Sequence, residues 1–281
     1  MSAADQKVWF ITGAGSGIGA GTARAAVEAG YRVVATGRNL ERLRNGLSDV
    51  AGDSLMFERL DVTDEGEAKR VVDAAVERFG RIDILVNNAG YSLLGNFEEM
   101  TIDQIERQFA PNFWGVVYMM RAALPVMRRQ RAGHIINISS VAGVVGQAAC
   151  AAYAATKFAV EGLSLSVAKE VEQFGIKMTV VEPGFFRTEL LDPKSVEWSS
   201  EHVADYGPAG SIAAAWGPYN GTQPNNPAKL GKALVQIAEM QSPPSVFAAG
   251  SDALETIVPA VEARLHDLRA HEALSRSTGG F

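Results

Sequence analysis

The chain has 281 residues, of which 47% are hydrophobic and 21% charged, so it can bury a sizeable core and falls outside the compositions typical of disordered chains. Its 26 basic and 32 acidic side chains leave a net charge of −6, which argues against a nucleic-acid partner, because such binders carry a basic stripe. A single cysteine, Cys150, excludes an internal disulfide, and the four histidines lack the spacing of a metal site.

The amino-terminal residues reach a glycine-rich turn after only a few apolar positions, which leaves no room for a signal peptide. We therefore expect a cytoplasmic location. The uncharged stretch 132–156 has about the length of a membrane span, but its polar residues and three glycines would break a helix within lipid. We expect no membrane partner, and we interpret the stretch as a buried strand, a loop and the start of a helix.

Short apolar runs rich in β-branched residues alternate along the chain with longer amphipathic segments. The short runs predict strands at 8–11, 32–36, 54–60, 82–87, 134–139, 177–182 and 246–249. The longer segments predict helices at 18–29, 39–48, 65–79, 102–130, 151–174, 227–240 and 253–268. This alternation predicts an α/β fold over residues 1–281, a single domain with a doubly wound parallel sheet and helices on both of its faces.

The first predicted strand runs into a glycine-rich turn that opens the first predicted helix. Glycines allow positive φ angles and a close approach of phosphate to the backbone, while the helix start supplies N–H donors. An ordinary tight turn is the alternative, but the place between first strand and first helix favours a dinucleotide site. The candidate cofactor-binding residues are Gly13, Ser16, Gly17, Ile18 and Gly19.

Arg38 follows the second predicted strand, where an NAD-binding protein carries an acidic residue for the ribose 2′-hydroxyl. A guanidinium suits a 2′-phosphate, so we expect NADP(H) as the preferred cofactor, with NAD as a second possibility. The alternative is that Arg38 only opens a solvated helix. After the third strand, Asp61 and Val62 either contact the adenine, or Asp61 or Thr63 caps the next helix.

Small residues follow the fourth predicted strand, at Asn88, Ala89 and Gly90, and would let a cofactor lie against the strand tips. A plain turn explains two adjacent asparagines less well.

Ser140 precedes Tyr153 by thirteen residues, and Lys157 follows Tyr153 by four. Residues at i and i+4 share one helix face, so we expect the Lys157 ammonium to lower the pKa of the Tyr153 phenol. Tyr153 would then act as a general acid and base. Ser140, at the end of the fifth strand, would hydrogen-bond the substrate oxygen. The alternative, an incidental pair on a solvated helix, fits poorly with the uncharged residues around Tyr153.

Together the TGAGSGIG turn, NNAG, the serine thirteen before YAATK, and Pro183-Gly184 with Thr188 resemble the single-domain short-chain dehydrogenase/reductase family over nearly the whole chain. The resemblance implies a Rossmann-like fold with seven parallel strands and reversible hydride transfer between NAD(P) and an alcohol or carbonyl.

The resemblance also implies roles for individual residues. Tyr153 would exchange the proton, and Lys157 would lower its pKa and hold the nicotinamide ribose. Asn112 would support a water relay to Lys157, and Pro111 before it should disturb the long helix. Pro183, Gly184 and Thr188 would frame and contact the nicotinamide.

Residues 185–228 are expected to cover the substrate, and their uncharged second half is rich in glycine and proline. An idle insertion is the alternative. Four aromatic residues favour a neutral, largely apolar alcohol or carbonyl: Trp198, Tyr206, Trp216 and Tyr219. Phe185, Phe186 and Val144 are further pocket candidates, although core packing explains each of them better.

Family members commonly form dimers or tetramers, and the small residues Ala151, Ala155, Ala159 and Gly162 would permit helices to pack closely in such a homo-oligomer. Two alternatives to the oxidoreductase stay open: an NADP(H)-sensing regulator without turnover, and an enzyme that catalyses epimerisation or dehydration. Among oxidoreductases, an NAD-preferring dehydrogenase is the alternative to the NADP(H)-dependent enzyme.

Overall fold

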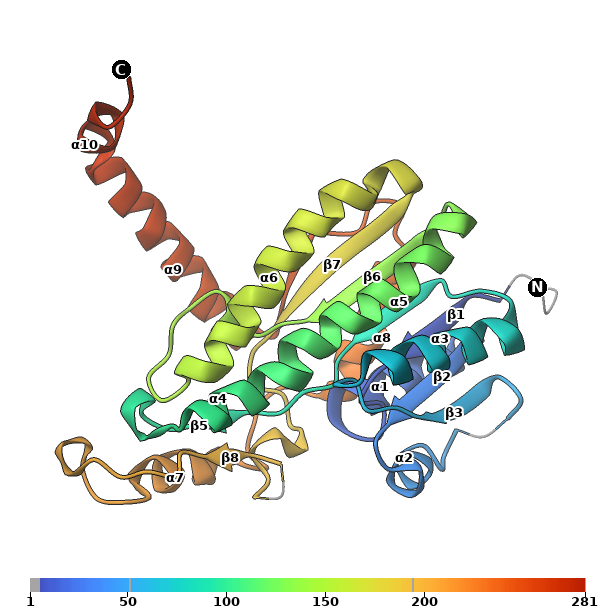
Figure 1. Ribbon diagram of the computed structural model, residues 1–281, viewed down its shortest axis with the longest axis horizontal. Coiled ribbons are helices and arrows are strands. Elements are labelled where there is room, and N and C mark those ends of the chain that lie inside the picture. Colours follow the sequence, from blue (N-terminus) through green and yellow to red (C-terminus); the bar gives the residue numbers. More distant parts are fainter. Residues whose placement is uncertain (1–5, 51, 194, 281) are drawn as a thin grey trace.

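The structure is a computed structural model that describes residues 6–50, 52–193 and 195–280. Its centre is a seven-stranded parallel sheet with the strand order β3-β2-β1-β4-β6-β7-β9 (Figure 1). The strands are β1 (Val8–Ile11), β2 (Arg32–Gly37), β3 (Leu55–Arg59), β4 (Ile84–Asn87), β6 (Gly133–Ile138), β7 (Ile176–Pro183) and β9 (Val246–Ala249). The predicted α/β class and parallel sheet are confirmed.

Helices connect these strands and cover both faces of the sheet. They are α1 (Gly17–Glu28), α2 (Leu40–Gly46), α3 (Glu65–Phe79), α4 (Ile102–Phe109), α5 (Gly115–Gln130), α6 (Ala151–Val171), α7 (Ser211–Trp216), α8 (Pro227–Glu239), α9 (Ser251–Ala270) and α10 (Glu272–Ser277). None of the helices within the described ranges is both long enough and apolar enough to cross a membrane.

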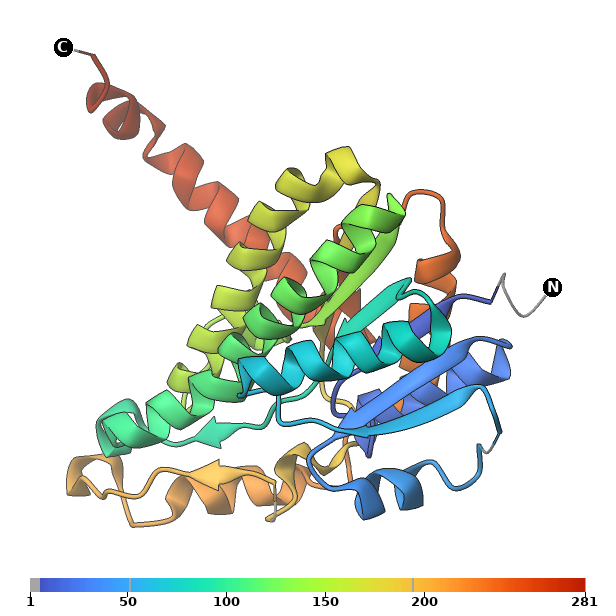
Figure 2. The same cartoon turned by 45° about the vertical axis from the view of Figure 1, so that its right-hand side comes forward.

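Alternate residues of each strand feed two hydrophobic cores. On β1, Trp9 and Ile11 pack with α1, α2 and α8, whereas Val8 and Phe10 pack with α3, α5 and α6. Figures 1 and 2 show α3, α5 and α6 side by side along one face of the sheet. Burial on both faces explains why the central strands are continuous apolar runs.

The strand order reverses between β1 and β4, which lie side by side although β2 and β3 separate them in the chain. In an open parallel sheet, ligands bind in the crevice beyond the carboxyl ends of the strands at such a reversal. The glycine turn after β1 and the NNAG sequence after β4 both lie at this point, so the topology brings together two motifs far apart in sequence.

The predicted helix 102–130 is interrupted. α4 ends at Phe109, a π-helical turn spans Ala110–Trp114, and α5 continues from Gly115. Pro111 lacks the N–H that a helix requires and its ring obstructs the preceding turn, so the expected disturbance is confirmed. The turn displaces Asn112 from regular helical geometry and directs its side chain toward the carboxyl end of β4.

The start of α3 differs from the expectation. The side chain of Asp64 caps this helix by accepting a hydrogen bond from the Glu67 N–H at 2.9 Å. Asp61 instead accepts bonds from the N–H and hydroxyl of Thr63, at 3.0 and 2.7 Å. The alternative that Asp61 or Thr63 caps this helix was wrong, because these two side chains hydrogen-bond each other instead.

Residues 185–228 are less irregular than their composition indicates. They contain α7 and the short strand β8 (Glu197–Trp198), which pairs in parallel with β5 (Leu93–Leu94). This small sheet joins the segment to the chain that leaves β4. In Figure 1, β8 and α7 lie below α4 and β5.

Candidate active site

The glycine turn between β1 and α1 is a tight backbone cradle. Gly17 has φ +54°, and a Cβ there would lie 3.1 Å from the side chain of Thr188. A Cβ on Gly19 would lie 2.3 Å from the carbonyl oxygen of Gly13. Only glycine fits these positions, and the turn leaves the first N–H groups of α1 facing the crevice.

Residues of the NNAG sequence stabilise this cradle through hydrogen bonds. The Asn88 amide donates to the carbonyl oxygens of Thr12 and Gly13, at 3.0 and 3.1 Å. The Thr12 hydroxyl oxygen accepts from the backbone N–H groups of Asn88 and Ala89, at 2.9 and 3.0 Å. Asn88 therefore stabilises the shape of the glycine turn, a role that the sequence alone did not predict.

Arg38 and Asp61 follow the adjacent strands β2 and β3. Arg38 is exposed. Burial opposes ionisation of Asp61, but hydrogen bonds from Thr63 and the charges of Arg38 and Arg59 outweigh it and lower the pKa of this carboxyl. Asp61 thus holds a negative charge, with the Arg38 guanidinium close enough to stabilise it.

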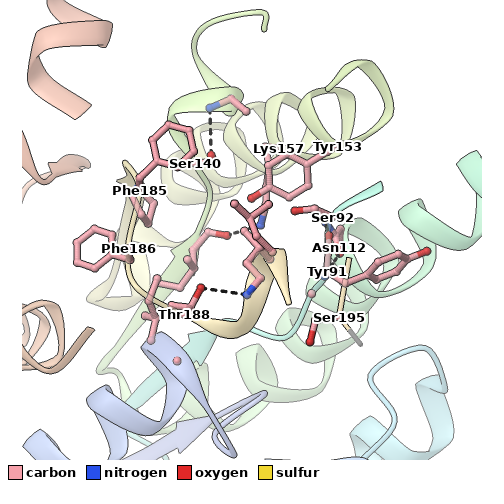
Figure 3. A pocket seen from close by; sticks show the side chains of 18 of the residues that line it. Tyr91, Ser92, Asn112, Ser140, Tyr153, Lys157, Phe185, Phe186, Thr188 and Ser195 are labelled. Atoms are coloured by element: carbon pink, nitrogen blue, oxygen red, sulfur yellow. Dashed lines mark hydrogen bonds between the residues drawn. The ribbon is translucent and has the colours of Figure 1, made fainter. Parts of the chain in front are cut away.

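Tyr153 lies on α6 between two serine hydroxyls (Figure 3). Its phenol hydrogen-bonds with Ser140, which follows β6, and with Ser92, which precedes β5. Ser92 is buried, at 2% exposure, and its backbone oxygen accepts from the Glu197 N–H at 2.9 Å. Sequence reasoning missed Ser92, because only the fold brings it beside Tyr153.

The pKa of Tyr153 is raised to about 12, since burial of the phenol outweighs the hydrogen bonds from Ser140 and Ser92. The expectation that Lys157 lowers this pKa was wrong for this arrangement. The Lys157 Nζ lies 5.6 Å from the centre of the tyrosine ring and donates to the Ile138 carbonyl oxygen at 2.8 Å. Its charge is therefore directed at the backbone and the ring face.

Lys157 is 6% exposed, and burial lowers its pKa to about 8 despite the opposing charge of Glu161. Glu161 lies one helical turn further along α6. Burial is the main cause that raises its pKa to about 7, and nearby Glu182 adds to the effect, whereas Ser139 and Lys157 oppose it. A buried carboxyl beneath the lysine was also not predicted, because its burial depends on Ser139 and Glu182 from other elements.

Asn112 binds both backbone polar groups of Tyr91. Its Oδ1 accepts from the Tyr91 N–H at 3.1 Å, and its Nδ2 donates to the Tyr91 carbonyl oxygen at 3.0 Å. Asn112 is 1% exposed and also approaches the Thr156 hydroxyl, at 3.4 Å. The π-helical turn thus uses Asn112 to hold Tyr91 and the adjacent Ser92 at the edge of the site.

One pocket of about 230 Å³ joins the cradle to these side chains. Its wall includes ten of the expected cofactor-binding residues besides Tyr153 and Lys157: Gly13, Ser16, Gly17, Ile18, Asn88, Ala89, Gly90, Pro183, Gly184 and Thr188. Ser140 and Asn112 line it as well. The other four expected cofactor-binding residues are not part of this wall: Gly19 lies against Gly13 and Asn88, and Arg38, Asp61 and Val62 follow β2 and β3.

The other end of the pocket is largely apolar. It is lined by Leu94, Val141, Phe185, Phe186, Leu190, Leu191 and Trp216. Phe185 packs on Trp216 and stacks on Tyr219, each with ring centres 6.1 Å apart. Of the four aromatic residues expected to favour an apolar substrate, only Trp216 is part of the pocket wall, and the further candidates Phe185 and Phe186 are part of it too. Trp198 packs behind the wall, next to Leu94 and Cys150.

Cys150 lies in the pocket wall, and burial raises the pKa of its thiol to about 11. A thiol that stays protonated near neutrality is a weak nucleophile, so Cys150 acts as a small hydrophobic residue.

The chain resembles known oxidoreductases over most of its length. A sequence model of the family described as short chain dehydrogenase matches residues 7–197. Oxidoreductase BOA17 of Botryotinia fuckeliana is 36% identical over 256 residues, which are 91% of this chain and 93% of that protein. The 3-ketodihydrosphingosine reductase of Bacteroides thetaiotaomicron is 37% identical over 240 residues, 85% of this chain and 86% of that protein.

Solved structures agree with these matches. A short-chain dehydrogenase from Streptomyces avermitilis has a TM-score of 0.87 at 37% identity, and the match covers 97% of this chain and 100% of that one. The closed form of a serine dehydrogenase complexed with NADP+ has a TM-score of 0.73 at 30% identity, over 86% of this chain and 93% of that one.

Proposed function

The chain belongs to the short-chain dehydrogenase family and is an oxidoreductase of that family, and from this premise we propose that it transfers a hydride between NADP(H) and an alcohol or carbonyl. The observation that carries the proposal is the single pocket in which Tyr153, flanked by Ser140 and Ser92, faces the glycine cradle of α1. A proton-transfer group and a phosphate-binding turn are thereby parts of one cavity.

The cradle suits a dinucleotide. The free N–H groups and the positive end of the α1 dipole favour a pyrophosphate, and the absent side chains of Gly17 and Gly19 leave the backbone accessible. Asn88 keeps this backbone in place. A bound nicotinamide coenzyme supplies or accepts the hydride. Pro183, Gly184 and Thr188 line the wall between the cradle and Tyr153, where they would position its ring.

Tyr153 is proposed as the residue that exchanges a proton with the substrate oxygen. With a pKa of about 12 the phenol is neutral near physiological pH, so in the reductive direction it donates its proton to the carbonyl oxygen of the substrate. Ser140 hydrogen-bonds the same oxygen as negative charge develops there. With the coenzyme bound, Lys157 would hold its nicotinamide ribose, and Asn112 would support the path by which water restores the proton. In the oxidative direction the same groups act in reverse.

The preference for NADP(H) rests on Arg38. It is exposed at the end of β2, where its guanidinium can bind a 2′-phosphate through two parallel hydrogen bonds. Solved relatives hold either coenzyme, NADP+ in the serine dehydrogenase and NADH in a 3-ketoacyl-(acyl-carrier-protein) reductase from Brucella melitensis, so the proposed preference depends on Arg38. Arg38→Ala should weaken NADPH binding by about tenfold or more and leave NADH binding unchanged. Tighter binding of NADH than of NADPH by the unaltered protein would contradict the preference.

The substrate is proposed to be neutral and largely apolar. Aromatic and aliphatic side chains line the pocket beyond Tyr153, and residues 185–228 supply most of them. The similarity to a 3-ketodihydrosphingosine reductase, an enzyme named for the reduction of a ketone, supports a carbonyl in this class. We further propose that the enzyme is a homodimer or homotetramer that packs through the small-residue face of α6.

Tyr153→Phe tests the function. This change removes the proton donor while the ring keeps its place, so the rate should fall about a hundredfold or more, with coenzyme affinity nearly unchanged. Coenzyme-linked absorbance, screened over steroids, retinoids, ketones and quinones, measures the rate, and fluorescence titration measures the affinity.

Tyr118→Phe is the matched control, because Tyr118 stacks on Trp114 and lies outside the pocket wall. Turnover of Tyr153→Phe at the unaltered rate would refute the assignment. Tight coenzyme binding by the unaltered protein with no turnover of any substrate would favour the regulatory alternative.

A further inference from the structure

The carboxyl-terminal helix α9 leaves the body of the protein (Figures 1 and 2). Only its first turns are anchored: Ala253 and Ile257 are buried against Val141, at the wall of the pocket. Every residue from 261 to 280 is exposed. A helical stretch of this length is marginally stable alone in water, because most helical stability in proteins comes from packing an apolar face.

The exposed side of α9 carries such a face. Five apolar residues follow one another at intervals of four, three, four and three positions: Leu254, Val258, Val261, Leu265 and Leu268. Their exposed fractions are 53%, 47%, 51%, 44% and 61%. We call these five residues the seam. Their spacing is the repeat by which two helices pack side by side in a coiled coil.

The charges beside the seam distinguish a protein partner from a membrane. Helices that lie on membranes are rich in lysine and arginine on their polar face. On α9, acidic residues at 252, 255, 262 and 267 outnumber basic ones at 264 and 269. Attraction to an anionic lipid surface is therefore weak, and an apolar helix face of a protein is the better match.

Glu255 and Arg269 indicate that the partner helix is α9 of a second copy. Each directly follows a seam leucine, so both lie on the same side of the seam, fourteen positions apart. They are about 21 Å apart along the axis and cannot meet within one helix. In an antiparallel pair of α9 helices related by a twofold axis, Glu255 of each copy faces Arg269 of the other, so two opposite-charge pairs form.

A parallel pair has the opposite effect. It would place Arg264 of one copy beside Arg269 of the other on both sides of the seam, which is repulsive. In the antiparallel pair, Glu262 of one copy faces Glu262 of the other near the twofold axis, and Arg264 faces Arg264 on the opposite side of the seam. Both of these contacts are repulsive. The outer charge pairs offset these two contacts, so charge selects the orientation while apolar burial supplies the affinity.

We propose that the seam of α9 binds the seam of a second copy of this chain, in antiparallel orientation. The interface is distinct from the small-residue face of α6. It also brings the tip of each partner helix toward the base of α9, where Asp252 accepts a hydrogen bond from the Phe185 N–H at 2.7 Å in the pocket wall.

Leu265→Glu tests the interface. Each dimer would lose the burial of two leucines and gain two charges, so its dissociation constant should rise about a hundredfold or more. Multi-angle light scattering should show half the mass of the unaltered protein. Ala263→Glu is the matched control, since it adds the same charge on the opposite side of the exposed helix and should leave the mass unchanged.

Charge reversal tests the orientation. Glu255→Arg and Arg269→Glu should each weaken association, and the double variant should restore it, because both pairs re-form with reversed sign. Circular dichroism checks that every variant is folded. A monomeric unaltered protein, an unchanged mass for Leu265→Glu, or a double variant no better than the single ones would each overturn the proposal.

Discussion

At the scale of single residues, the site depends on how burial competes with hydrogen bonding at Tyr153. Two serines stabilise the phenolate, yet burial dominates and keeps the phenol protonated. Burial therefore leaves the phenol neutral near physiological pH, which is the state that the proposed proton donation requires. The same balance makes the second serine, Ser92, a positioning residue whose contribution is measurable.

Ser92→Ala should raise the pKa of Tyr153 further, because one of the two hydrogen bonds that favour the phenolate is lost. Alcohol oxidation needs the phenolate, so its pH profile should shift to higher pH and its kcat should fall about tenfold. Coenzyme affinity should stay the same. Steady-state rates in both directions across pH measure this. A lower rate with an unmoved profile would contradict the role and leave Ser92 as a packing residue.

Glu161 predicts a pH dependence of stability. Its pKa rises from the ordinary 4.5 to about 7 in the folded protein, mainly through burial. Between these values the folded state retains a proton at Glu161 that the unfolded chain releases, so the contribution of Glu161 to the free energy of unfolding declines as pH rises from about 4.5 to about 7, then levels. His134, whose pKa burial lowers to about 4, contributes in the opposite direction between about pH 4 and 6.5. Glu161→Gln should remove the contribution of Glu161, as chemical denaturation at a series of pH values would show.

Glu182 contributes a decline of the same sign that remains in the variant, because burial raises its pKa too. An identical slope in Glu161→Gln and the unaltered protein would show that Glu161 ionises normally.

At the scale of elements, α1 and α8 pack through glycines. A Cβ on Gly231 of α8 would lie 2.3 Å from the Gly21 carbonyl oxygen of α1. Gly231→Ala should therefore force the helices apart and lower the free energy of unfolding by about 1–3 kcal/mol. Gly217→Ala is the control, since Gly217 has a helical φ of −51° and a Cβ there meets nothing within 4 Å; it should raise the free energy of unfolding by about 0.5–1 kcal/mol. Equal effects of both changes in urea denaturation would contradict the close approach.

The regular elements were largely predictable, because alternating apolar runs and amphipathic segments report burial directly. Pro111 even marked the break between α4 and α5. The strands β5 and β8 were not predictable, since two residues are too few to establish a period. Ser92 and Glu161 were missed for a related reason: their environments are built by Tyr153, Ser139 and Glu182, which the sequence does not place beside them.

At the scale of the whole molecule, the sequence predicts which residues form the cradle and which lie beside it at Tyr153 and Lys157, and the sheet order explains why these residues share one pocket. Strands β1 and β4 end side by side where the strand order reverses. The projection of α9 could not be foreseen, because an amphipathic pattern does not say whether its apolar face covers the chain's own core or meets solvent.

The pairing of β5 with β8 limits how substrate can enter. Backbone bonds from Glu197 to Ser92 and from Ser199 to Leu94, both 2.9 Å, tie the near half of segment 185–228 to the strand beside Tyr153. The far half has glycines at positive φ, at Gly207, Gly210 and Gly221, and no such ties to β5. If substrate enters through this segment, we therefore expect residues 207–221 to move more than the edge that is paired with β5.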